Sequence, residues 1–192
     1  IERGVDASIL MTNARFNDSV DRFYEFEGVP VHEHRFASRL HNKSISQVFE
    51  PRIYQAVRQD IERLKPDLVH VHNLSGASLA PILACKHARV PAVLTLHDHW
   101  LLCANNNLYQ NGGKLCDPAH THGRCAECFR RYDFWADVPY RKETFQFLTQ
   151  SVRRFFSPSQ RLIELHGAGG YDTKRFRLVP NGIQQTSTEG EI

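Results

Sequence analysis

The sequence predicts an α/β protein with a Rossmann-like, doubly wound parallel sheet. Short apolar segments rich in β-branched residues alternate with segments in which apolar residues recur at helical spacing. Two of the apolar segments end abruptly in the polar pairs His72-Asn73 and His97-Asp98. Ligands of such folds bind beyond the carboxyl ends of the strands, so we expect a site where these pairs lie.

The composition is that of one globular domain. The chain has 192 residues, of which 41% are hydrophobic and 23% charged, and its net charge is +3. This charge is too small to indicate nucleic acid as a partner. We see neither a signal peptide nor a run of about 20 apolar residues that could span a membrane, so we expect a cytoplasmic protein.

The first third of the chain predicts two strands and a long helix. Residues 6–12 and 29–34 are the strands, and residues 18–26 between them are a weak helical stretch. Residues 49–64 carry apolar side chains at helical spacing, with a proline in the first turn and another after the end.

The middle of the chain repeats this plan. Residues 68–72 predict a central strand, residues 78–88 a helix and residues 92–96 the next strand. We expect His70 to be packed within its strand and Cys85 to be a core residue of the helix.

The last third predicts a helix, a strand, a helix and a strand. Apolar residues between 145 and 155 are spaced as in a helix, and residues 154–157 form a short strand. Ser159 should cap a helix that ends before Gly167. Residues 177–179 are the last strand.

A long irregular insertion at about residues 97–140 contains four cysteines with 12, 8 and 2 intervening residues: Cys103, Cys116, Cys125 and Cys128. Four thiolates bind Zn²⁺ tetrahedrally at roughly 2.3 Å, and a structural zinc contributes on the order of 10 kcal/mol to ordering such a segment. An iron–sulfur cluster uses similar ligands, and His120 or His122 could replace one cysteine. The remaining alternative is cysteines that only pack, reduced or as disulfides.

A basic region follows the insertion. From Arg124 to Arg161 there are eight Lys or Arg and four Asp or Glu, a net charge of +4, with aromatic residues interleaved. One interpretation is a solvated face above a partly buried aromatic cluster. The other is a peripheral contact with anionic lipid head groups or a lipid-linked acceptor at the inner face of the membrane.

Three separated segments recur together in a known family. They are LVHVHN at 68–73, VLTLHDHWLLC at 93–103 and FFSPSQ…FRLVPNGI at 155–183. Together they resemble the N-terminal domain of a GT-B fold, retaining family 4 (group 1) glycosyltransferase. The H-D-x-W-x-x-C sequence resembles a cysteine-containing subgroup that acts on bacterial surface polysaccharides or other glycoconjugates. The resemblance covers about residues 4–183.

The resemblance implies a domain organisation and an activity. Residues 1–183 would be the acceptor-side domain without the family's first strand, residues 184–192 would begin the interdomain linker, and the C-terminal donor-binding domain would be absent. The full-length protein would be a transferase of hexosyltransferase type, moving a sugar from a nucleotide sugar to a glycan or lipid-linked acceptor with retention. This fragment alone would be inactive.

The resemblance also assigns roles to residues. A histidine at the position of His97 reaches the donor sugar, where hydrogen bonds stabilise charge on an oxocarbenium-like transition state. The alternative for His97 is a hydrogen bond to a loop backbone, and Asp98 either acts with it or fixes the turn. Four residues are expected to bind substrate: His72, Asn73, His99 and Asn181. For His72 and Asn73 the alternative is to cap the next helix, and Asn181 belongs to the hinge turn.

Two other functions fit the same pattern. One is a non-enzymatic Rossmann-like binding module whose zinc-stabilised loop docks a partner. The other is a nucleotide-sugar epimerase of the same fold. A nucleic-acid-binding loop would hold more basic residues than Lys114 and Arg124, the two that lie between Cys103 and Cys128.

Overall fold

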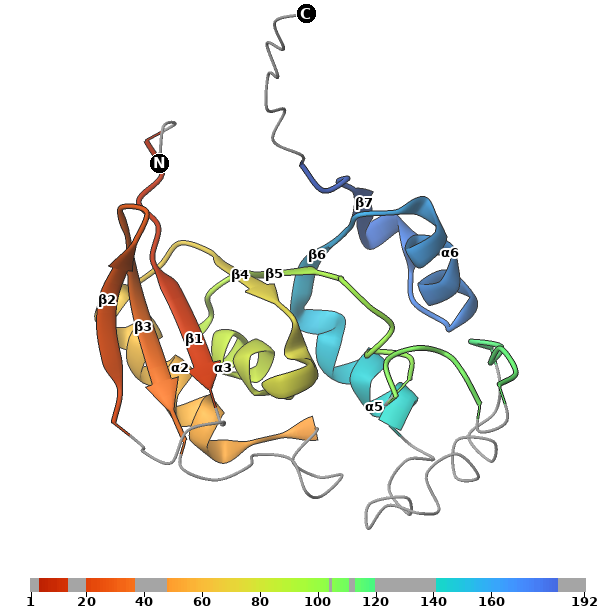
Figure 1. Cartoon of the computed structure of the whole chain (residues 1–192), viewed down its shortest axis with the longest axis horizontal. Helices are drawn as coiled ribbons and strands as arrows, with labels where there is room; N and C mark the ends of the chain where they lie inside the picture. Colours follow the sequence, from red (N-terminus) through yellow and green to blue (C-terminus); the bar gives the residue numbers. More distant parts are fainter. Residues whose placement is uncertain are drawn as a thin grey trace, which may run out of the picture.

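The chain folds around two sheets that flank packed helices (Figure 1). The computed structural model describes residues 4–13, 20–36, 48–103, 105–110, 113–119 and 141–182. Within this part of the chain, three strands form one sheet in the order β1-β3-β2 and four form a second in the order β4-β5-β6-β7.

The three-stranded sheet combines a parallel pair with a hairpin. β1 (Ile9–Asn13) runs parallel to β3 (Val29–Arg35), which confirms the two predicted strands. β2 (Arg22–Phe26) is antiparallel to β3, so the helical stretch predicted there is wrong. Glu27 and Gly28 join β2 to β3 with φ values of 48° and 78°. Two residues of positive φ make the tight turn that suits a twisted hairpin, and the aromatic residues before it favour a strand.

The predicted long helix is confirmed as α2 (Pro51–Leu64). The Glu50 side chain accepts a hydrogen bond from the Arg52 backbone N–H at 3.2 Å, and proline occupies the first turn. The helix ends at Lys65, whose left-handed backbone returns its N–H to the carbonyl of Ile61. α2 contacts β1 and packs along α3 (Ala80–Ala88), so it links the two sheets.

The four-stranded sheet is parallel throughout, as predicted. Its strands are β4 (Val69–His72), β5 (Ala92–Thr95), β6 (Val152–Ser157) and β7 (Phe176–Leu178). The register places one buried row across all four strands: Val71, Leu94, Phe155 and Phe176. The next row lies on the opposite face and is exposed or half-buried: His72, Thr95, Phe156 and Arg177. The core therefore lies on one face, and the other presents polar side chains.

Two helix boundaries differ from the prediction. α5 (Arg141–Leu148) stops before one 3₁₀ turn, η3 (Thr149–Ser151), so the apolar positions at 152 and 155 belong to β6. α6 (Gln160–Ala168) begins as predicted, because the Ser159 hydroxyl accepts from the Leu162 N–H at 3.2 Å. It continues through Gly167 and ends at Gly169. α6 packs on β6 and β7.

The predicted fold class is confirmed: an α/β protein with a parallel sheet and helices, as in a Rossmann-like domain. Among the helices of the described residues, none combines the length and the apolar character needed to cross a membrane.

Candidate functional site

The two polar pairs predicted at strand ends do meet. His72 is the last residue of β4, and its register partner on β5 is Thr95, two residues before His97. His72 Nδ1 and His97 Nε2 are hydrogen-bonded at 3.0 Å, and the two rings stack with centroids 5.3 Å apart. Because β4 and β5 are parallel neighbours, their carboxyl ends share one edge and bring the two imidazoles together.

His70 is a third histidine beside this pair. The sequence did not predict it as part of the site. His70 is exposed rather than packed, and its Nε2 is hydrogen-bonded to Thr95 Oγ1 at 2.7 Å. Its ring lies 4.2 Å from that of His72. Residues two apart on a strand share a face, so the alternation of His70 and His72 was the signal that could have revealed it.

The surroundings of His70 and His72 favour the neutral form of both imidazoles. Burial lowers the pKa of His70, and the charge of a protonated His97 would lower it further. Burial also lowers the pKa of His72, with smaller contributions from His70 and His97 in the same direction. A neutral imidazole offers one donor and one acceptor. The row is therefore suited to hydrogen-bond hydroxyl groups, which also donate and accept.

Asp98 has both carboxylate oxygens engaged within its own loop. Oδ1 accepts from the Trp100 backbone N–H at 2.9 Å, and Oδ2 accepts from Asn106 Nδ2 at 2.8 Å. Trp100 holds the loop to the core, because it is buried and packs on Phe145 with ring centroids 4.7 Å apart. This geometry agrees with the alternative in which Asp98 fixes the turn.

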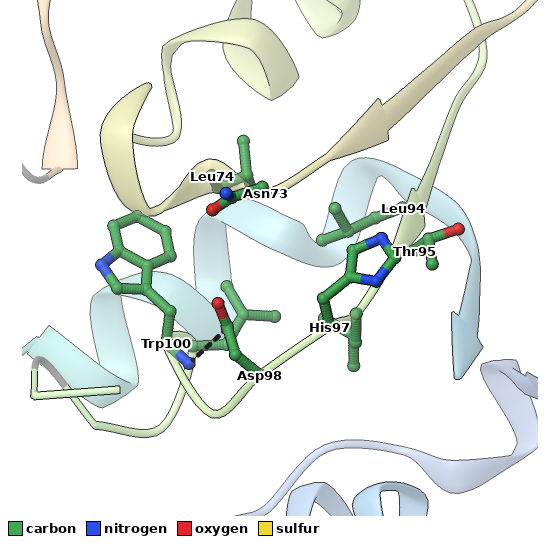
Figure 2. Close-up of a pocket in the computed structure, with 9 residues that line it drawn as sticks. Asn73, Leu74, Leu94, Thr95, His97, Asp98 and Trp100 are labelled. Carbon is green, nitrogen blue, oxygen red and sulfur yellow. Dashed lines mark hydrogen bonds between the residues drawn. The ribbon is translucent and has the colours of Figure 1, made fainter. Parts of the chain in front are cut away.

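A small hollow open to solvent lies beside His97 (Figure 2). Its lining combines leucines and Trp100 with the polar residues Asn73, Thr95, His97 and Asp98. Asn73 has a left-handed backbone, with φ of 46°, and its side chain makes no capping hydrogen bond to the short helix η1 (Leu74–Gly76). The Asn73 side chain therefore does not cap that helix, and it lines the hollow instead.

Two other predicted substrate-binding residues lie elsewhere. His99 is half-buried and is not among the residues that line the hollow. Burial lowers its pKa, against the opposing effect of the Asp98 charge. Asn181 is exposed beyond β7 and does not line the hollow either. The structure thus brings together His72, Asn73, His97 and Asp98 of the predicted set.

The described part of the cysteine insertion contains a small hairpin. The Cys116 backbone N–H donates to the Leu108 carbonyl at 2.6 Å, and Tyr109 bridges to Leu115. Cys103 and Cys116 are half-buried against the core. Four further predicted or alternative ligands lie outside the described residues: His120, His122, Cys125 and Cys128. The metal prediction therefore stays a prediction.

Cys85 behaves as predicted. It is fully buried in α3, and burial raises the pKa of its thiol to about 11. A thiol with that pKa stays protonated at neutral pH, as expected of a cysteine that packs in the core.

Comparison with known proteins identifies the family of this α/β chain. Residues 1–186 match the model of Glycosyltransferase Family 4. A segment of 76 residues is 34% identical to a protein described as an uncharacterized 42.6 kDa protein in the cps region of Klebsiella pneumoniae. That match covers 40% of this chain and 18% of the relative's length. Since the family match extends over nearly the whole sequence, the chain belongs to Glycosyltransferase Family 4.

Proposed function

We propose that this chain is the acceptor-side domain of an enzyme that transfers a sugar, with retention, from a nucleotide sugar to a glycan or lipid-linked acceptor. The observation that carries the proposal is the hydrogen-bonded pair of His72 and His97 at the carboxyl edge of a parallel sheet in a chain of this family. The cps region that gives the Klebsiella relative its description is in keeping with a glycan acceptor.

His97 is the residue that we expect to touch the donor sugar. Its Nε2 is hydrogen-bonded to His72, which leaves Nδ1 for a sugar hydroxyl. His72 acts through His97, because the contact between the rings fixes the orientation of the second imidazole. A positioned hydrogen bond in a partly dry cleft stabilises charge that develops as the glycosidic bond to phosphate breaks.

The transfer step needs no protein nucleophile. The acceptor hydroxyl attacks the anomeric carbon on the face from which the phosphate leaves, and its proton passes to the departing phosphate oxygen. Because the new carbon–oxygen bond forms on the same face on which the old one breaks, the configuration is retained. Asp98, with its two oxygens engaged by Trp100 and Asn106, supports the loop that carries His97.

A second domain completes the site in this proposal. The hollow at His97 is small and open to solvent, whereas a nucleotide sugar needs a cleft that encloses most of its surface. We therefore propose that a donor-binding domain faces this edge of the sheet. Asn181, exposed after β7, lies where the connecting hinge would begin.

The cysteine insertion fits into the same proposal as a structural element. Four thiolates, two of them from the half-buried Cys103 and Cys116, would hold a zinc ion that orders the loop after His97. The basic residues that follow would then face a lipid-linked acceptor or the membrane surface.

Activity of the full-length protein tests the role of His97. We expect His97→Ala to lower kcat on the order of 100-fold, as loss of one positioned hydrogen bond does in other enzymes. His72→Ala should lower it less, because it removes only the group that orients His97. His87→Ala is the matched control, because His87 lies on α3, away from the site, and is hydrogen-bonded to Tyr54. Release of nucleoside diphosphate measures turnover, and unchanged kcat in His97→Ala would remove this residue from the mechanism.

A further inference from the structure

A second cluster of histidines and carboxylates lies on the three-stranded sheet, apart from the site at β4 and β5. It joins three elements: Asp21 precedes β2, His32 and His34 are on β3, and Asp60 comes from α2. His34 and Asp60 are buried, and His32 is nearly so, whereas the side chain of Asp21 is 39% exposed. The proposed sugar transfer uses none of these groups.

Asp60 determines where the two imidazole rings carry their hydrogen atoms. Its carboxylate lies 2.8 Å from His32 Nδ1 and 2.9 Å from His34 Nε2. A carboxylate held by Arg63, at 2.6 Å, only accepts hydrogen bonds, so each ring donates from that nitrogen. In the neutral ring the other nitrogen then carries a lone pair.

The two nitrogens with lone pairs lie near a third acceptor. His34 Nδ1 lies 2.8 Å and His32 Nε2 3.4 Å from Asp21 Oδ2. His32 Nε2 is buried and has no hydrogen-bond partner among the described residues. Three acceptor atoms therefore lie close together with no donor between them, an arrangement that a bound cation would satisfy.

Added protons cannot supply hydrogen bonds to all three acceptor atoms without a further cost. One added proton gives one imidazole ring a second N–H. The lone pair of the other ring then still faces the carboxylate of Asp21. Two added protons place two imidazolium charges on rings with centroids 3.9 Å apart in a largely buried position, where like charges repel. A metal ion accepts all three lone pairs at once.

We propose that Asp21, His32 and His34 form a binding site for a divalent transition-metal ion, with zinc as the ion that suits it best. One ligand atom from each residue lies within 4.8 Å of the others. The separations bracket the roughly 3.3 Å between donor atoms around a tetrahedral ion with bonds of about 2.0–2.1 Å. Two imidazoles and one carboxylate leave a fourth position for water, on the side where Asp21 is exposed.

The surroundings have the features of a supported metal site. Both histidines donate their remaining N–H to Asp60, the carboxylate–histidine arrangement that fixes ligand tautomers around zinc. Arg63 in turn holds Asp60. Phe23 stacks on His32 with ring centroids 4.0 Å apart and limits the rotation of that ring. A bound ion would thereby join the β2–β3 hairpin to α2.

Metal titration of this chain tests the proposal, with Co²⁺ as the spectroscopic probe and Zn²⁺ as the competitor. Thiolate ligands give cobalt an intense near-ultraviolet charge-transfer band, which imidazole and carboxylate ligands lack, so the spectrum separates this site from the cysteines. We expect Asp21→Asn to bind one ion fewer per chain than wild type with the thiolate band unchanged. Asp60→Asn should weaken the same ion about 10–100-fold, as loss of a supporting carboxylate does.

Control variants separate loss of this metal site from a general effect of losing a carboxylate or of unfolding. Asp67→Asn removes an exposed carboxylate elsewhere and should keep the wild-type stoichiometry. His34→Gln removes a buried ligand, and Asp21→Asn covers the case in which that variant does not fold. Zinc should raise the Tm of wild type more than that of Asp21→Asn. Equal stoichiometry in wild type and Asp21→Asn, including no ion in either, would overturn the proposal and leave the cluster to protons.

Discussion

Replacing Asp98 separates support of the loop from a direct part in the chemistry. Asp98→Ala removes both acceptors of the Trp100 N–H and the Asn106 amide. Hydrogen bonds to a charged group contribute about 1.5–3 kcal/mol each. Because the side chain is only half-buried, we take the lower part of that range for the two hydrogen bonds, about 3–4 kcal/mol in total. For a domain of this size this corresponds to a fall in Tm of roughly 5–15 °C.

Asp98→Asn is the informative companion. Its amide oxygen can still accept from the Trp100 N–H, but its NH₂ group would meet the NH₂ group of Asn106. Asn106 can reverse its amide, because its Oδ1 is buried without a hydrogen-bond partner among the described residues and would then gain one, while its NH₂ group takes the position that Oδ1 leaves. We therefore expect Asp98→Asn to recover most of the Tm lost in the alanine variant.

Melting curves followed by circular dichroism, together with sugar transfer by the full-length protein, check this reasoning. A supporting role predicts that Asp98→Asn reduces kcat less than about tenfold, because the loop that presents His97 is restored. If Asp98 instead acted as a catalytic base, both Asp98→Ala and Asp98→Asn would lose activity, because neither side chain can accept the proton. An asparagine variant with wild-type Tm and the low kcat of Asp98→Ala would refute the supporting role and make Asp98 a catalytic residue.

Two further predictions concern stability. Burial lowers the pKa of His166 to about 4, from an unfolded value of about 6.5. The folded chain therefore loses roughly 3 kcal/mol as pH falls through that interval, and urea unfolding at pH 7.5 and 4.5 should show a smaller loss in His166→Gln than in wild type. An equal loss in both would contradict the assignment. Gly28 has φ of +78° with open space where a Cβ would lie, so Gly28→Ala should cost only backbone strain, about 1–2 kcal/mol in urea unfolding. Gly182→Ala, also in open space but without a positive φ, should be neutral, and equal effects would argue against strain.

The elements with strong local signals were predictable. α2 has apolar residues at helical spacing over its whole length and prolines at both ends, and Ser159 stands where an N-cap is needed. The polar pairs after β4 and β5 revealed the shared edge, because parallel neighbours must end on the same side. Periodicity failed for β2, which has only five residues. Five residues fit a helix or a strand equally well, and the Glu27-Gly28 turn is a weaker hairpin signal than Asn-Gly.

Contacts between segments that are distant in the chain could not be predicted from the sequence. His34 and Asp60 are 26 residues apart, and only the packing of β3 on α2 brings them together. The loop hydrogen bond from Asn106 to Asp98 joins residues only eight positions apart, but this spacing predicts no contact either. His70 was misjudged for a different reason, because the apolar residues beside it suggested burial on both faces of the strand. In the structure, His70 and His72 are both exposed on one face of β4.

A double-mutant cycle on His72 and His97 tests most directly whether adjacent strands present one working unit. The kcat for sugar transfer by the full-length protein is measured for wild type, each alanine variant and the double variant. If His72 acts through His97, the double variant should be about as slow as His97→Ala alone. Losses that multiply would show two independent residues and contradict the account.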